Sequence, residues 1–162
     1  MSNTCMVGFD GKVYYNDKAD TTSAGAGTYE VPVWVEIPMV KDVTVSSSAD
    51  KIDDTDRGST FKKYCAGQFD LDAVMNLSYR NGNAILEVIR DAWLARTTLD
   101  VMILDGDEAT TGTEGFRIQT KCFTHDWEQT MSDVMMVDIN LAPTYFENAA
   151  GNEVEPEWVT MA

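Results

Sequence analysis

A strict alternation of apolar and polar residues runs through residues 69–79, FDLDAVMNLSY. Odd-numbered positions carry Phe, Leu, Ala, Met, Leu and Tyr, and Asp70, Asp72, Asn76 and Ser78 lie between them. A period of two is typical of a β-strand that is buried on one side. We therefore expect one face of this strand in the core and the other in water.

An amphipathic helix is predicted to follow this strand. Residues 84–96, AILEVIRDAWLAR, place apolar side chains three and four positions apart. Asn83, or Asn81 before it, is expected to cap the helix, and Gly82 permits the positive φ of a tight turn. The predicted buried positions are Ile85, Val88, Ile89, Ala92 and Trp93. The next segment, LDVMILD at 99–105, is expected to be a second strand, and the helix carries no candidate catalytic group.

Other segments also predict strands. Residues 31–48 alternate, but Pro32 and Pro38 favour an edge strand or a bend between two strands. Residues 116–129 and 134–143, joined by a turn at 131–133, are expected to pair as an antiparallel hairpin. The predicted fold class is therefore mainly β, a sandwich-like or barrel-like domain with one packed helix.

The 162 residues predict a single domain with three irregular parts. Residues 1–30 are glycine-rich and are expected to form a flexible arm with at most a short strand at KVYY. Residues 46–60, SSSADKIDDTDRGST, are expected to form a long polar loop, and loops of this length are usually functional or disordered. Residues 105–115 resemble a hairpin connection. Residues 146–162 are expected to be an acidic, loop-like tail that Trp158 anchors.

The net charge of −15 disfavours several function classes. Twelve basic residues against 27 acidic ones oppose charge-driven binding to nucleic acid or to an anionic membrane. There is no apolar run near the roughly 18 residues of a membrane helix, and the first residues lack the features of a signal peptide. We expect synthesis in the cytoplasm and no membrane partner.

Motifs of catalysis and cofactor binding are missing from the sequence. His125 is the single histidine, which excludes sites that need two imidazoles. The sequence contains no P-loop, GxGxxG or GxSxG. Cys5, Cys65 and Cys122 have no CxxC spacing and are expected to be reduced thiols. These features predict neither an enzyme nor a cofactor site.

Acidic clusters are the remaining candidates for chemistry. Those at residues 53–56 and 105–108 lack the glutamate of an EF-hand loop, so solvated turns are favoured over metal sites. Asp70 and Asp72 share one strand face and could serve acid–base catalysis, although a hydrated wall is favoured. No metal site is therefore predicted.

In arrangement, the chain resembles a phage tail tube protein, the major tail protein of the long-tailed phages. The similarity spans about residues 31–145. It is carried by WVEIPMVKDVTVSSS with its Asp-rich loop, FDLDAVMNLSY, NAILEVIRDAWLAR and EGFRIQTKCFTHDWEQTMSDVMMVDINLAPTY.

This resemblance implies a subunit of hexameric rings, in which strands from all copies join in one large β-barrel. The stacked rings would form a tube for DNA in the virion tail, made in the host cytoplasm. Implied partners are further copies of the chain, a tape measure protein, a tail terminator, tail-tip proteins and DNA in passage. The expected lumen-facing residues are Asp70, Asp72, Asn76 and Ser78. The expected inter-ring or inter-subunit loop residues are Asp50, Lys51, Ile52, Asp53, Asp54, Asp56 and Arg57.

Three alternatives stay open at this point. One is the inner tube of a secretion or contractile injection system, which would assemble by the same ring logic. Another is a monomeric β-barrel that binds a small ligand or peptide. The third is a small acid–base enzyme that uses Asp70 and Asp72.

Overall fold

The structure is a computed structural model that describes residues 8–17 and 27–162. Most of the arm predicted at residues 1–30 lies outside the described residues, but KVYY belongs to a strand, as predicted. The chain is mainly β, and the described residues contain one α-helix. The elements are η1 (Gly8–Asp10), β1 (Lys12–Asn16), β2 (Trp34–Glu36), β3 (Val40–Asp53), β4 (Tyr64–Ser78), α1 (Ala84–Ala95), β5 (Leu99–Leu104), β6 (Glu114–Glu128), β7 (Met136–Pro143) and β8 (Glu157–Thr160).

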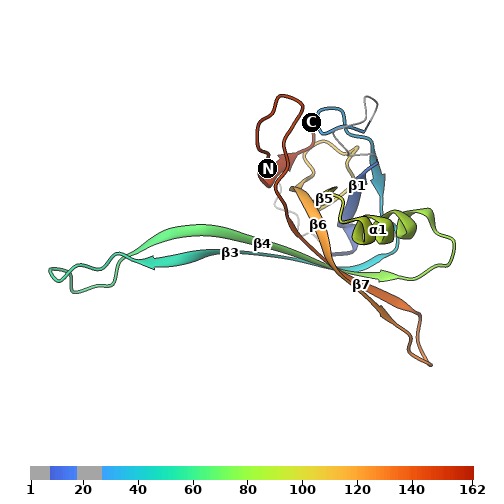
Figure 1. Cartoon of the computed structure of the whole chain (residues 1–162), viewed down its shortest axis with the longest axis horizontal. Helices are drawn as coiled ribbons and strands as arrows, with labels where there is room; N and C mark the ends of the chain where they lie inside the picture. Colours follow the sequence, from blue (N-terminus) through green and yellow to red (C-terminus); the bar gives the residue numbers. More distant parts are fainter. Residues whose placement is uncertain (1–7, 18–26) are drawn as a thin grey trace.

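All eight strands belong to one antiparallel sheet of order β2-β1-β5-β6-β7-β4-β3, with β8 paired to β6. Strand β6 has two halves: residues 115–120 pair with β5, and residues 120–128 pair with β7. The elements β1, β5 and α1 lie together in a compact body, from which the β3–β4 and β6–β7 hairpins project (Figure 1). The predicted β6–β7 hairpin and the predicted edge strand β2 are both confirmed.

The main core lies between the helix and the apolar face of β4 and β7. Of the alternating positions on β4, Leu71, Ala73, Met75 and Leu77 are buried as predicted. Phe69 is 85% exposed, because this part of β4 pairs with β3 but lies beyond the β7 ladder, which begins at Ala73. The core also contains Val101 of β5, Val137, Ile139 and Leu141 of β7, and Leu86, Ile89 and Ala92 of α1.

The helix begins where its cap predicts and is turned slightly from the predicted orientation. The Asn83 side chain accepts hydrogen bonds from the backbone N–H groups of Ile85 and Leu86, and Gly82 has a φ of 72°. Leu86 is buried, whereas Val88, predicted to be buried, is exposed. Each residue advances about 100° around a helix. Leu86 and Val88 are therefore about 200° apart and lie at opposite edges of the apolar stripe, so a small rotation of the helix buries one and exposes the other.

The predicted loop at residues 46–60 is wrong over its first half. Residues 46–53 continue β3 and pair with β4, from Ser46 opposite Asp72 to Asp53 opposite Tyr64. The loop itself spans residues 54–63. The segment has few apolar side chains because it does not contact the core. It is a strand nevertheless, because its backbone pairs with β4.

The predicted loop-like tail is also corrected. Residues 157–160 form β8, which pairs with the start of β6. Trp158, predicted to anchor this tail, is 59% exposed, and its ring meets that of Phe116 edge-on, with the centroids 4.8 Å apart. Phe146, earlier in this tail, is buried.

Candidate assembly surfaces

One face of the sheet carries mostly polar and acidic side chains across four strands. Residues directly opposite each other in an antiparallel ladder point to the same face. The polar positions of β4 therefore join the partners that the register gives them on β3, β7 and then β6. This surface, called here the acidic face, comprises Asp42, Thr44, Ser46, Ser48, Asp70, Asp72, Val74, Asn76, Ser78, Lys121, Thr124, Asp126, Glu128, Met136, Asp138, Asn140 and Ala142.

Hydrogen bonds fix the centre of the acidic face. The Asn140 amide donates to the Asp72 carboxylate at 3.1 Å, and the Asn76 amide donates to Asp138. Asp70 is exposed, while Asp72, Asn76 and Ser78 are half-buried. The structure thus brings the four residues predicted for a lumen onto one surface, together with carboxylates from β3, β6 and β7 that the sequence did not single out.

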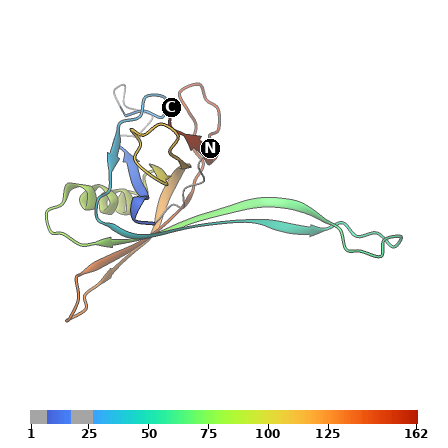
Figure 2. The same ribbon diagram turned by 180° about the vertical axis from the view of Figure 1, so that it is seen from behind.

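The outer half of the β3–β4 hairpin stands clear of the rest of the chain (Figures 1 and 2). Its large apolar side chains are exposed, with Phe61 at 81% exposure and Ile52 and Tyr64 above half. A lone two-stranded hairpin is marginally stable in water, and clustered exposed apolar side chains mark interaction surfaces. These features make the outer hairpin a candidate binding surface.

All seven predicted loop residues lie in this outer part. Asp50, Lys51, Ile52 and Asp53 are on β3, and Asp54, Asp56 and Arg57 are in the turn. The turn is ordered by its own side chains. The Thr55 N–H donates to Asp53 at 2.9 Å, the Lys63 N–H donates to the Thr55 hydroxyl at 3.1 Å, and the Gly58 N–H donates to Asp56 at 3.0 Å. Bonds from the Thr55 side chain and backbone lower the pKa of the Asp53 carboxyl from its ordinary value.

The part of the sheet that carries the acidic face has two free edges. Strand β3 pairs only with β4, so its outer edge is open. The second half of β6, residues 121–128, pairs only with β7, since β5 and β8 end their pairing by Thr120. Across the order β6-β7-β4-β3 every neighbour is antiparallel, so β6 and β3 also run in opposite directions. Open strand edges are templates for pairing with another chain.

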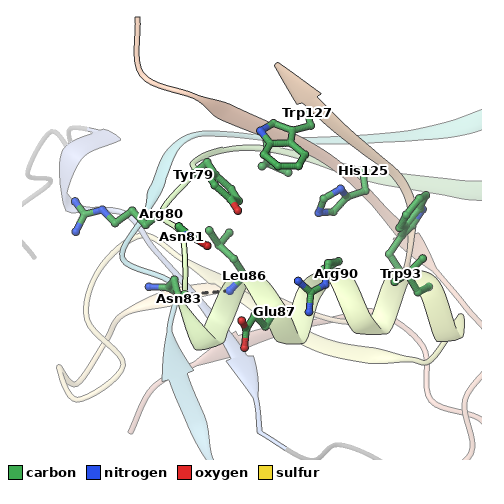
Figure 3. A pocket seen from close by; sticks show the side chains of 13 residues that line it. Tyr79, Arg80, Asn81, Asn83, Leu86, Glu87, Arg90, Trp93, His125 and Trp127 are labelled. Atoms are coloured by element: carbon green, nitrogen blue, oxygen red, sulfur yellow. Dashed lines mark hydrogen bonds between the residues drawn. The ribbon is translucent and has the colours of Figure 1, made fainter. Parts of the chain in front are cut away.

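A cleft of about 370 Å³ lies between α1 and the outer part of the β6–β7 hairpin (Figure 3). Two pairs of aromatic rings stand among its lining residues. The Tyr79 and Trp127 rings lie 4.8 Å apart, and the Trp93 and His125 rings stack at 5.3 Å. No serine or cysteine is among the residues that line it. The lining favours apolar contact over nucleophilic chemistry.

The body contains a buried ion pair that the sequence analysis did not predict. Asp100 is fully buried on β5, and Arg117 on β6 reaches it with Nη2 at 2.5 Å and Nε at 3.1 Å. Asn16 donates to the same carboxylate at 3.2 Å, and the Arg117 guanidinium lies 3.9 Å from the centre of the Tyr29 ring. Burying a carboxylate is costly unless it is paired. The sequence feature that could have indicated this pair is Asp100, the one charged residue in the apolar strand LDVMIL.

Two further findings concern the described part of the chain. None of its helices is long and apolar enough to cross a membrane. Within residues 8–17 and 27–162, no three His, Cys, Asp or Glu side chains are grouped so that they could hold a metal ion. Cys65 is an exposed free thiol and Cys122 a buried one, whose pKa burial raises to about 11.

No family model matches the chain, and no curated protein matches it. Solved structures do match. A chain in the tail of an empty gene transfer agent particle, refined with C6 symmetry, has a TM-score of 0.66 at 13% identity and covers 86% of this chain and 95% of its own. A chain of the SPP1 tail tube has 0.67 at 11% identity, covering 96% and 80%. A chain of the sheath–tube complex of PVC, an extracellular contractile injection system, has 0.62 at 13% identity, covering 98% and 93%.

These matches confirm the predicted fold class: mainly β, with one packed helix. They also confirm the resemblance to tail tube proteins at the level of the fold. Identities of 11 to 13% extend that conclusion no further than the fold.

Proposed function

We propose that the chain is a structural, self-assembling protein, a subunit of hexameric rings that stack into a phage tail tube through which DNA passes. The observation that carries this proposal is the four-stranded wall β6-β7-β4-β3. It has two open antiparallel edges, an acidic face on one side and the helix with the rest of the body on the other.

Ring closure follows from the two edges. If β3 of one copy lies beside residues 121–128 of β6 in the next, the two strands are antiparallel, as in the rest of the sheet. The contact uses a different patch on each copy, and such a contact closes into a ring when its rotation allows. Closure would leave no free strand edge in the wall, which removes the aggregation hazard of a long open edge.

The acidic face would then line the lumen, and the body would form the outside of the tube. Asp70, Asp72, Asn76 and Ser78 lie on that face. Carboxylates there would repel DNA phosphates, and the repulsion is effective within a Debye length of about 8 Å at physiological salt. DNA would therefore pass without sticking.

Negative-stain electron microscopy and sedimentation of the purified protein test the proposal. We expect rings or tubes, together with sedimenting species far above the 18.0 kDa of one chain. A single species near that mass at high concentration would contradict it and would favour a monomeric binding module instead.

The lumen assignment gives a sharper prediction. A variant with Asp70→Lys and Asp72→Lys, assembled in the presence of short duplex DNA, should retain DNA that nuclease cannot digest, because the added charges lie inside the tube. Retention should weaken steeply with salt, as phosphate contacts do.

The matched control places the same two changes on the exposed side of α1, at Glu87→Lys and Asp91→Lys. DNA bound by that variant should be digestible. Digestible DNA on the Asp70 and Asp72 variant would place these residues on the outside and overturn the lumen assignment.

A second candidate is the inner tube of a contractile injection system, which the fold match to the PVC chain favours. Both assignments use the same ring geometry. Genes for a capsid and a tape measure protein beside the gene for this chain would favour the phage tube. In that case a tape measure protein, a tail terminator and tail-tip proteins would be its partners, and the virion tail its location.

A further inference from the structure

Closing the wall into a barrel requires the strands of neighbouring copies to be offset where they meet. Strands in a closed barrel usually tilt by about 35–45°, and this tilt goes with a stagger of the ladder, called the shear. A barrel of about eight strands whose shear is also eight has a tilt of about 36°. Because the tilt depends on the ratio of shear to strand number, a copy with the wall strands β6-β7-β4-β3 needs an offset of about four residues, whatever the number of copies.

The offset falls at the seam between copies, because the ladders inside a copy fix which residues are level with one another. Across the wall, Val45 of β3 is level with Cys122 of β6, and Asp42 is level with Asp126. An odd offset would join the acidic face of one copy to the body side of the next. The offset at the seam is therefore an even number of residues.

Coverage of the two open edges selects the direction of the offset. If β3 is shifted by about four residues one way, only residues 40–42 lie beside the free half of β6 in the next copy. If it is shifted the other way, residues 44–50 lie beside residues 121–128, with Ser46 opposite Asp126 and Val45 opposite Trp127. Only the second direction covers the whole open edge of β6, and an uncovered edge is a template for unwanted pairing.

The charges at the seam favour the same offset. Lys121 is the one basic residue of the acidic face, and it forms no ion pair with any described residue. Asp50 lies two positions beyond Ser48 on β3, so its side chain points to the same side of the sheet. Asp50 also has no ion pair within the described part of the chain. The second direction places Lys121 of one copy opposite Asp50 of its neighbour.

Smaller offsets bring like charges together. With no offset Asp126 would oppose Asp42, and with half of the required offset Glu128 would oppose Asp42. Like charges directly opposite each other destabilise a sheet. In the full offset, Asp126 and Glu128 oppose the neutral side chains of Ser46 and Thr44.

On the body side, the same offset covers exposed apolar surface. The Trp127 side chain is 53% exposed in the single chain. It would lie opposite Val45 of the neighbouring copy, and Val45 lines a groove of about 780 Å³ together with Val43 and Ile103. Because this groove runs along the open edge of β3, a second copy paired to that edge would lie at its mouth.

We propose that residues 44–50 of β3 pair with residues 121–128 of β6 in the next copy, with Lys121 against Asp50 on the lumen side and Trp127 beside Val45 on the body side. This register rests on the proposed ring and assigns the residues that meet at each of its seams. Lys121 selects the register, because among the offsets that cover the β6 edge it meets a carboxylate only in this one.

Disulfide cross-linking measures the register. In a background with Cys5→Ser and Cys65→Ser, the pair Ser46→Cys and Asp126→Cys should oxidise to a ladder of linked copies on a non-reducing gel. These positions are three strands apart within a copy, about 14 Å, whereas a disulfide needs Cα atoms within about 7 Å. The bond can therefore form only between copies.

The control pair is Asp42→Cys with Asp126→Cys, which would meet if there were no offset and should give no ladder. A ladder from the control pair, or from neither pair in a protein that forms rings, would overturn this register and leave the ring intact. A wild-type protein that forms no rings would contradict the proposed function itself, and this register with it.

A charge exchange tests the contact of Lys121 with Asp50. Lys121→Glu should raise the protein concentration at which rings form by about tenfold or more, because every seam then holds two opposed acids. Adding Asp50→Lys should restore ring formation, whereas adding Asp42→Lys in its place should not. Circular dichroism verifies that each variant is folded. Unchanged ring formation by Lys121→Glu, or no better recovery with Asp50→Lys than with Asp42→Lys, would overturn this contact.

Discussion

Replacing Arg117 with methionine will lower the free energy of unfolding by about 3–5 kcal/mol, as is typical when one partner of a buried ion pair is removed. The variant leaves the fully buried Asp100 carboxylate with only the Asn16 amide as a polar partner. It also removes the cation that lies against Tyr29 and its bond to the Tyr29 carbonyl at 2.8 Å. Urea unfolding followed by tryptophan fluorescence measures the loss, at a concentration where sedimentation shows only the monomer.

A second change separates the stranded charge from lost packing. Adding Asp100→Asn to Arg117→Met removes the unpaired charge, so more than half of the lost stability should return. Lys63→Met provides a matched control at an exposed ion pair and should change the free energy of unfolding by about 1 kcal/mol or less. Equal losses from Arg117→Met and Lys63→Met would show that the buried pair has no special weight.

Removing the outer hairpin will abolish assembly and leave the body folded. Replacing residues 49–69 with Asn-Gly would join Ser48 to Asp70, which already face each other across the ladder. Asn-Gly favours the turn type that suits a two-residue hairpin connection. None of the removed side chains belongs to the buried core clusters, so the loss of stability should be small.

Sedimentation should then show a monomer at concentrations where the wild type forms rings, because residues 49–53 of the open β3 edge and the exposed turn after them are gone. Near-ultraviolet circular dichroism and urea unfolding report whether the body is intact. Tubes formed by the shortened protein would show that the hairpin has no part in assembly.

The parts of the fold that the sequence predicts are those set by residues close together in the chain. On β4, one face meets the core and the other meets water, so residues 71–77 alternate visibly. The start of α1 can be predicted because Asn83 caps the backbone of the next residues and Gly82 supplies the positive φ just before it. The β6–β7 hairpin is legible because its strands are adjacent in the chain.

Residues 46–53 were unreadable as a strand for the opposite reason. Both faces of this segment are exposed to solvent, so its sequence does not alternate between apolar and polar residues. It forms a strand because it pairs with β4, which follows later in the chain. The rotation of α1, which buries Leu86 instead of Val88, depends on how the helix settles on the sheet. Strand β8 is only four residues long and is formed by its pairing with β6.

The candidate surfaces divide in the same way. Asp70 and Asp72 could be chosen from alternation alone, whereas Asp42, Asp126 and Asp138 join them only through the register of three ladders. Asp100 and Arg117 lie on different strands. The sequence alone does not show which basic residue will pair with a buried carboxylate.

Strand β6 has a mechanical role in this architecture. Its first half is held in the body by β5 and β8, and its second half is held in the wall by β7. A β-bulge at Phe123 lies in the second half, three residues after Thr120, and the extra residue of a bulge bends a strand locally. A load on the wall is therefore transmitted to the body along one continuous backbone instead of through a loose connection. We expect β6 to bend most easily at this bulge, where its ladder with β7 is interrupted.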